Sequence, residues 1–137
     1  MTAAQIFSVA NTAVLPGWLL LICAPRWRYT QTIAGCVLPL ALSVTYVAVL
    51  ALHWGKSSGG FNSLAAVSQL FANPWLLLGG WIHYLAFDLF IGAWELRDGQ
   101  TRGLSHWLLI PCLLLTFLFG PAGLLLFHLL RRPLSKN

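Results

Sequence analysis

Long runs of apolar residues, separated by short polar stretches, occupy most of the chain. About 20 helical residues are needed to cross the ~30 Å hydrocarbon core of a bilayer. Four runs reach that length, at residues 4–24, 30–54, 74–96 and 105–130. The pattern predicts an all-α membrane protein, with residues 1–137 forming a single transmembrane domain of four spans.

Prolines inside these runs predict kinks rather than helix ends, because neighbouring helices can satisfy the carbonyls that a proline frees. The expected bends are at Pro16, Pro39, Pro111 and Gly120-Pro121. Residues 61–72 are too short and too polar to span, and their apolar positions fall mostly on one helical side. They predict a short amphipathic helix lying in the interface between spans two and three. Asn73-Pro74 then predicts the start of the third span, with Asn as the N-cap.

Composition agrees with a membrane setting. Of the 137 residues, 58% are hydrophobic and only 8% are charged, whereas about a quarter of the residues of a soluble domain are charged. The net charge of +5 comes from cations at the ends of the apolar runs, where they can reach lipid headgroups. Nucleic acid is excluded as a partner, because its binders carry a Lys/Arg-rich face.

The orientation in the membrane is not decided by the charges of a four-span chain. Such a chain has both termini on one side. The connections after spans one and three carry Arg26, Arg28, Arg97 and Arg102, and the other side carries Lys56, Arg131, Arg132 and Lys136. The positive-inside rule therefore ties, and a dominant first helix would place the N-terminus away from the cytoplasm.

The third run carries most of the candidate chemistry. At 100° per residue, one helical stripe contains Trp81, Tyr84, Asp88 and Glu95, and a second stripe contains His83, Phe87, Phe90 and Trp94. A carboxylate at the depth of Asp88 costs several kcal/mol unless it is paired, wetted or protonated. Asp88 is therefore either part of a functional site or a packing anchor. In the second case Tyr84, Asn11 or Thr45 would donate a hydrogen bond to it.

Other groups in the run extend this picture. His83 is a candidate proton donor or acceptor next to Asp88. The two are five residues apart and do not face each other directly, but a substrate could lie between the stripes. Gly79, Gly80 and Gly92 allow neighbouring helices to approach closely.

Metal and disulfide chemistry are not predicted. No pair among His53, His83, His106, His128, Asp88 and Glu95 has the i, i+3 or i, i+4 spacing of helical ligands, so no metal site is expected. The 3 cysteines are scattered through apolar stretches and give no disulfide framework.

Three segments carry a resemblance to a known family. They are WIHYLAFDLF (81–90), the following Asp98-Gly99, and PCLLLTFLFGPAGLLLF (111–127). With AVLPGWLLLICAP (13–25) and LAAVSQLFANPWLLLGGW (64–81), they make the chain similar to the neoxanthin-synthase-like, or abscisic-acid-deficient-four-like, integral membrane proteins. The likeness covers nearly the whole chain. The short chain without a transit peptide suggests a bacterial relative, hence a multi-pass protein of a bacterial inner membrane.

The resemblance implies carotenoid chemistry, since plant members are required to convert violaxanthin to neoxanthin. That isomerisation opens an epoxide and removes a neighbouring vinylic proton without net redox change, and it needs no cofactor. Asp88 and His83 would supply the acid and the base, with Tyr84 assisting. The substrate-binding candidates are Trp81, Phe87, Phe90, Trp94 and Glu95. The substrate would be a carotenoid or another isoprenoid lipid.

Two further hypotheses compete with the isomerase. The chain could instead be a non-catalytic pigment- or lipid-binding subunit of a larger membrane complex. A proton or ion path needs a chain of ionisable groups, and one acid at mid-membrane is too few. The expected partners are membrane lipids, a carotenoid or other hydrophobic ligand, and a second copy or another subunit of a membrane complex.

Overall fold

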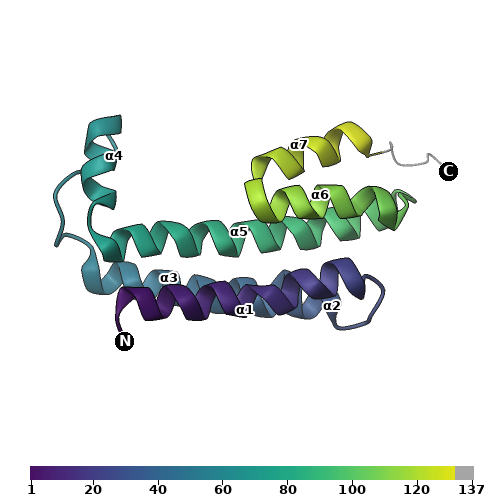
Figure 1. Ribbon diagram of the computed structural model, residues 1–137, viewed down its shortest axis with the longest axis horizontal. Helices are drawn as coiled ribbons and strands as arrows, with labels where there is room; N and C mark the ends of the chain where they lie inside the picture. Colours follow the sequence, from purple (N-terminus) through teal and green to yellow (C-terminus); the bar gives the residue numbers. More distant parts are fainter. Residues whose placement is uncertain (132–137) are drawn as a thin grey trace.

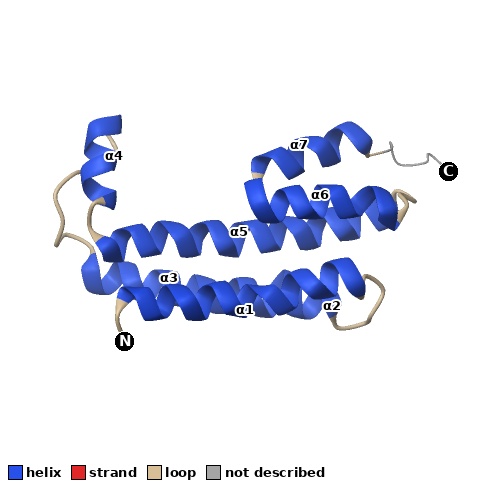
Figure 2. Ribbon diagram, in the orientation of Figure 1, coloured by secondary structure: helices blue, strands red, loops and turns tan. Residues whose placement is uncertain are grey.

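The computed structural model describes residues 1–131, and this part is built from helices joined by turns and one longer loop over residues 54–63, without a strand (Figure 2). Within these described residues, three helical stretches are long and apolar enough to cross a membrane. They are α1 (Ala3–Cys23), the stretch Thr30–His53 and α5 (Pro74–Thr101). The prediction of an all-α protein is confirmed, and so are the first three long helices.

The first span begins at a capping box, in which the Thr2 hydroxyl accepts from the Gln5 N–H and the Gln5 side chain accepts from the Thr2 N–H. The second span is one helical stretch made of α2 (Thr30–Thr32), the π-helical turn η1 (Ile33–Val37) and α3 (Leu38–His53). The π turn lies just before Pro39, whose ring crowds the carbonyl of Gly35 four residues earlier. Pro39 thus widens the helix locally and does not end it.

The segment between the second and third spans contains α4 (Leu64–Phe71), one helix within the predicted 61–72. Ser63 caps it by accepting from the Ala66 N–H at 3.0 Å. In Figure 1, α4 stands away from the bundle beside the start of α5.

The central helix is α5, which contacts α1, α3, α4 and α6. Asn73 caps it by accepting from the Trp75 N–H at 2.9 Å, as predicted. The helix runs five residues beyond the expected end at residue 96, because the polar stretch after it stays helical until Gly103 adopts a positive φ of 71°. Its 28 residues give it a length of about 42 Å at 1.5 Å per residue.

A continuous fourth span over residues 105–130 was predicted, and the structure corrects this. The run forms two helices, α6 (His106–Phe119) and α7 (Pro121–Leu130), which pack on each other as a hairpin (Figure 1). Gly120 separates them with φ +30° and ψ −87°, so the expected bend is a reversal of direction. At about 21 and 15 Å, neither helix is long enough to cross ~30 Å of hydrocarbon.

The hairpin places the end of α7 at a different end of the molecule from the one that four spans would give. In Figure 1, α6 runs back along α5 from its C-terminal end, the hairpin tip lies over the middle of α5, and α7 returns. The N-terminus and the end of α7 therefore lie at opposite ends of the molecule, whereas four spans would have placed both termini on one side. The core between α1, α3, α5 and α6 is filled by apolar side chains such as Val14, Leu21, Ile82, Leu89 and Leu113.

Candidate functional site

The stripe of Trp81, Tyr84, Asp88 and Glu95 faces α1 and the hairpin, as its shared helical side predicted. Trp81 Nε1 donates to Asn11 Oδ1 at 2.7 Å, which links α5 to α1. The Tyr84 hydroxyl donates to the Leu118 carbonyl at 3.0 Å, which links α5 to the last turn of α6. The polar groups of the stripe therefore lie at helix contacts in the bundle.

Asp88 lies under the tip of the hairpin. A Cβ atom added to Gly120 would come within 2.7 Å of Asp88 Oδ1 and 3.2 Å of Oδ2, so only a glycine fits between this carboxylate and the turn. Among residues 1–131, no donor satisfies Asp88 Oδ2, although this atom is buried. Two donors expected for an anchor role bond elsewhere: Asn11 binds Trp81, and the Thr45 hydroxyl donates to Ala41 of its own helix.

Glu95 lies two turns further along α5 and has a structural partner. Its side chain is fully buried, and the Thr116 hydroxyl of α6 lies 2.8 and 2.9 Å from its two carboxylate oxygens. Thr116 in turn leaves no space for a side chain at Gly123 of α7. Glu95, which was predicted to bind substrate, therefore joins α5 to the hairpin.

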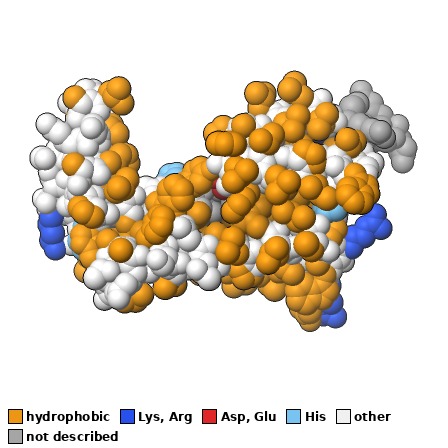
Figure 3. All heavy atoms as spheres, viewed as in Figure 1, with side chains coloured by type: hydrophobic (Ala, Val, Ile, Leu, Met, Phe, Trp, Pro, Cys, Tyr) orange, Lys and Arg blue, Asp and Glu red, His pale blue; other side chains and the backbone are white. Residues whose placement is uncertain are grey.

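Two adjoining cavities run along α5 from the hairpin tip toward α4, and both are lined by Trp81 and Tyr84. The larger, about 630 Å³, is enclosed by apolar residues of α1, α4 and α5 that include Phe7, Phe71 and Leu77. The smaller, about 390 Å³, lies between α1 and α6 and includes Asn11 and Leu118. We call these two cavities the tyrosine groove. Figure 3 shows a mainly hydrophobic hollow between α4 and the hairpin, with acidic atoms visible at its hairpin side.

His83 lies apart from Asp88. Its ring packs on Tyr46 of α3 at 5.7 Å and on Phe87 at 4.8 Å between ring centroids. It lines a separate cavity of about 320 Å³ between α3, α4 and α5, which also includes Trp54 and Phe61. The structure does not bring His83 to the Asp88 carboxylate, as their five-residue spacing predicted, and it places the two residues in different surroundings.

The other aromatic candidates of the second stripe also lie in different parts of the molecule. Phe87 and Phe90 line a cavity of about 270 Å³ beside η1 and the start of α3. Trp94 packs against the Phe127 and His128 rings of α7, at 5.3 and 5.7 Å between centroids. The second stripe is therefore divided among three surroundings and does not form one lining. At the expected glycine contacts, Gly92 packs under Trp18 of α1, where an added Cβ would come within 2.7 Å of the indole ring.

Sequence reasoning missed the partners that the hairpin supplies. Gly120 was noted only as a bend, and Thr116 was not singled out, although it is the one polar residue between Leu113 and Phe119. A lone hydroxyl in an apolar run was the available signal. In the part of the chain that the structure describes, His, Cys, Asp and Glu form no group of three that could hold a metal ion.

Comparison with known proteins gives one family and one curated relative. The family model described as ABA DEFICIENT 4-like matches residues 5–127. The chain is 27% identical over 144 residues to the Arabidopsis thaliana protein ABA DEFICIENT 4, chloroplastic. The match covers 98% of this chain and 64% of that relative, so the chain spans about two thirds of the relative's length. This relative is a chloroplast protein of a plant and does not support the expected bacterial inner membrane. No solved structure matches the chain.

Proposed function

The chain belongs to the ABA DEFICIENT 4-like family, and we propose that it isomerises a carotenoid, or a related isoprenoid lipid, inside the bilayer. The observation that carries the proposal is the position of Asp88. This carboxylate has an oxygen without a hydrogen-bond donor among the described residues. It lies one helical turn beyond Tyr84, which lines both cavities of the apolar tyrosine groove.

The groove suits a long apolar ligand. From Pro74 to Asp88, α5 extends about 21 Å at 1.5 Å per residue, and the larger cavity is lined almost wholly by apolar side chains. An extended isoprenoid chain would lie along α5 between α1 and α4. One end group would then reach Tyr84, which lines both cavities.

Tyr84 takes the place that the sequence assigned to His83. In the reaction implied by the family likeness, the Tyr84 hydroxyl gives its proton to the epoxide oxygen as the C–O bond breaks. The Asp88 carboxylate removes the proton from the neighbouring vinylic carbon, whose electrons form the new double bond of the allene. Transfer of that proton from Asp88 to the tyrosinate restores both groups. Atoms and electrons balance without a cofactor.

Violaxanthin is the probe for this proposal, incubated with the purified protein in vesicles and followed by chromatography and absorption spectra. Asp88→Asn and Tyr84→Phe should each lower the rate of isomer formation about 100-fold or more, the range for a lost acid or base. Thr45→Val is the matched control, because its hydroxyl bonds only within α3. If Asp88→Asn forms the isomer at the wild-type rate, the role of Asp88 as the base is wrong.

A second result would point to the alternative function. If violaxanthin copurifies or binds but is recovered unchanged, the chain is a pigment-binding subunit, and Asp88 serves the hairpin contact alone. If His83→Gln loses conversion while Asp88→Asn stays active, the reaction takes place in the separate cavity that His83 lines.

A further inference from the structure

The hairpin gathers three separate parts of the chain at one end of the molecule. Gln100 Nε2 of α5 donates to the Pro25 carbonyl of the turn after α1 at 3.0 Å. His106 Nε2 at the start of α6 donates to the Ile22 carbonyl at 2.7 Å. Arg131, just after α7, lies 3.8 Å from Asp98. Residues 24–31, residues 97–106 and Arg131 therefore form one surface, which we call the arginine end.

Cations are distributed unequally between the two ends. The arginine end carries Arg26, Arg28, Arg97, Arg102 and Arg131. At the opposite end, where α1 begins and α3 leads into α4, the described residues supply Lys56. In Figure 3, basic side chains lie at two places on the right of the molecule and at one place on the left.

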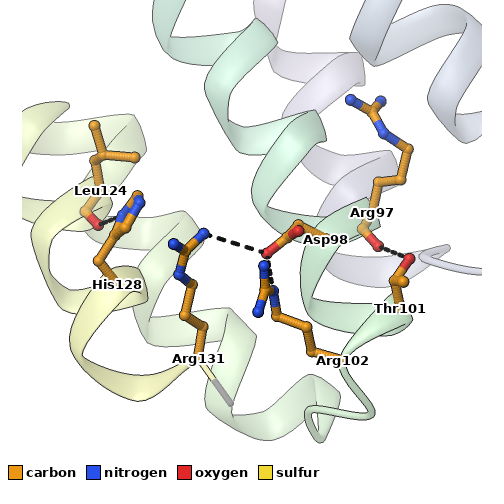
Figure 4. Close-up of polar contacts among 7 residues, drawn as sticks. All are labelled: Arg97, Asp98, Thr101, Arg102, Leu124, His128 and Arg131. Atoms are coloured by element: carbon orange, nitrogen blue, oxygen red, sulfur yellow. Dashed lines mark hydrogen bonds and ion pairs between the residues drawn. The ribbon is translucent and has the colours of Figure 1, made fainter. Parts of the chain in front are cut away.

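Among the described residues, the half-buried carboxylate of Asp98 partly offsets the charge of the arginine end. Asp98 Oδ2 lies 2.6 Å from Arg102 Nε and 3.8 Å from an Arg131 nitrogen (Figure 4). Glu95 is buried beneath this surface and is bound to Thr116. Two other arginines have uncharged partners, since Arg97 donates to Gln31 and Arg28 lies over the Tyr29 ring. A net positive surface remains.

We propose that the arginine end is the cytoplasmic face of the protein and binds the phosphodiester headgroups of anionic phospholipids. Lys and Arg accumulate on the cytoplasmic side of membrane proteins, and that leaflet is the negatively charged one. Exposed aromatic side chains flank the same surface, among them Trp27 at 49% and Trp107 at 82% exposure. Such side chains prefer the headgroup level.

The proposal resolves the tie left by the sequence. The tie arose because a continuous fourth span carries Arg131 to the side opposite Arg97 and Arg102. The hairpin instead returns Arg131 to their side, and the counts become unequal. Arg132 and Lys136, also counted in that tie, lie outside the described residues.

Cysteine labelling in a bacterial expression host tests the orientation with the full chain. Cys23, Cys36 and Cys112 are first replaced by Ala, and single cysteines are then introduced as Ser58→Cys or Ser105→Cys, at exposed positions of opposite ends. A membrane-impermeant maleimide should label Ser58→Cys in cells whose outer membrane has been opened. It should label Ser105→Cys only after the inner membrane is also permeabilised. The reverse pattern, or equal labelling of both, would overturn the orientation.

Lipid retention tests the headgroup contact separately. The wild-type protein, solubilised from vesicles of phosphatidylcholine and phosphatidylglycerol, should retain phosphatidylglycerol several-fold above its share of the mixture. The combined Arg26→Gln, Arg28→Gln and Arg97→Gln variant should lose this enrichment, and Lys56→Gln should keep it. Lysine at the same three positions keeps the charge and should restore most of the enrichment. Equal retention by the glutamine and wild-type proteins would contradict the contact.

Discussion

Asp88 and Gly120 meet where the hairpin turns, and each constrains the other. Gly120 has a backbone conformation that side-chain-bearing residues rarely adopt, with φ +30°. The space where its side chain would stand is occupied by the Asp88 carboxylate. One position thus combines a backbone requirement with a steric one, and the two can be separated experimentally.

Gly120→Ala should lower the thermal midpoint in detergent more than Gly103→Ala. Both glycines have positive φ, which costs about 1–2 kcal/mol for an L-residue, but nothing lies within 4 Å of the Cβ position at Gly103. The difference between the variants therefore contains the crowding by Asp88 together with the less favourable backbone conformation of Gly120. Tryptophan fluorescence during heating provides the midpoint for each protein.

Combining Gly120→Ala with Asp88→Ala isolates that crowding. The double variant should lose less stability than the two single variants together, because removing the carboxylate makes room for the methyl group. Strict additivity would mean that the two groups do not press on each other in the folded protein.

At the residue scale the sequence predicted which polar residues share one side of α5, but not which groups each of them contacts. Trp81, Tyr84, Asp88 and Glu95 share a helical face, and all four lie toward α1 and the hairpin. Periodicity reports direction around one helix axis only. It could not show that His83, 5 positions before Asp88, packs on Tyr46 instead.

The hairpin is held to α5 by one buried polar contact and by close packing. The Thr116 hydroxyl binds the fully buried Glu95 carboxylate. On the other side of Thr116, Gly123 brings α7 against α6 without an intervening side chain. These elements fix the position of the tip over Asp88.

Thr116→Val should destabilise the protein by about 1–3 kcal/mol, because it leaves the buried Glu95 carboxylate without its hydroxyl donor. Thr45→Val, which removes a hydroxyl bonded within its own helix, should cost clearly less. Denaturant titration in mixed micelles compares the two variants. In a Glu95→Leu/Thr116→Val protein most of the loss should disappear, since neither polar group remains unpaired. A double variant as unstable as Thr116→Val would argue against the contact.

The reversal at Gly120 was beyond what hydropathy could predict. Residues 105–130 have the length and composition of one span, and a bend and a reversal use the same Gly-Pro pair. The decision rests on tertiary contacts, namely the packing of α7 on α6 and the Glu95–Thr116 bond. By contrast, the N-cap of α5 at Asn73 depends on neighbouring residues alone and was predicted correctly.

For the molecule as a whole, the hairpin predicts termini on opposite sides of the membrane. A reporter that is active only in the cytoplasm, fused after the C-terminus, should be active, and the same reporter fused before the N-terminus should be silent. The reason is that α1 begins at the end opposite to the end of α7 (Figure 1). Equal activity of the two fusions would instead indicate that both termini lie on one side, as a fourth complete span requires.

The hairpin extends over only part of α5, and this determines how a ligand can arrive. Beyond its tip the groove side of α5 is bordered by α1 and α4, and the hollow there is open and largely apolar (Figure 3). In the orientation proposed above, this opening lies in the leaflet opposite the arginines. A molecule dissolved among the acyl chains of that leaflet can reach Tyr84 by lateral diffusion in the membrane, without passing through water. The supply of substrate would then depend on its concentration in one half of the bilayer.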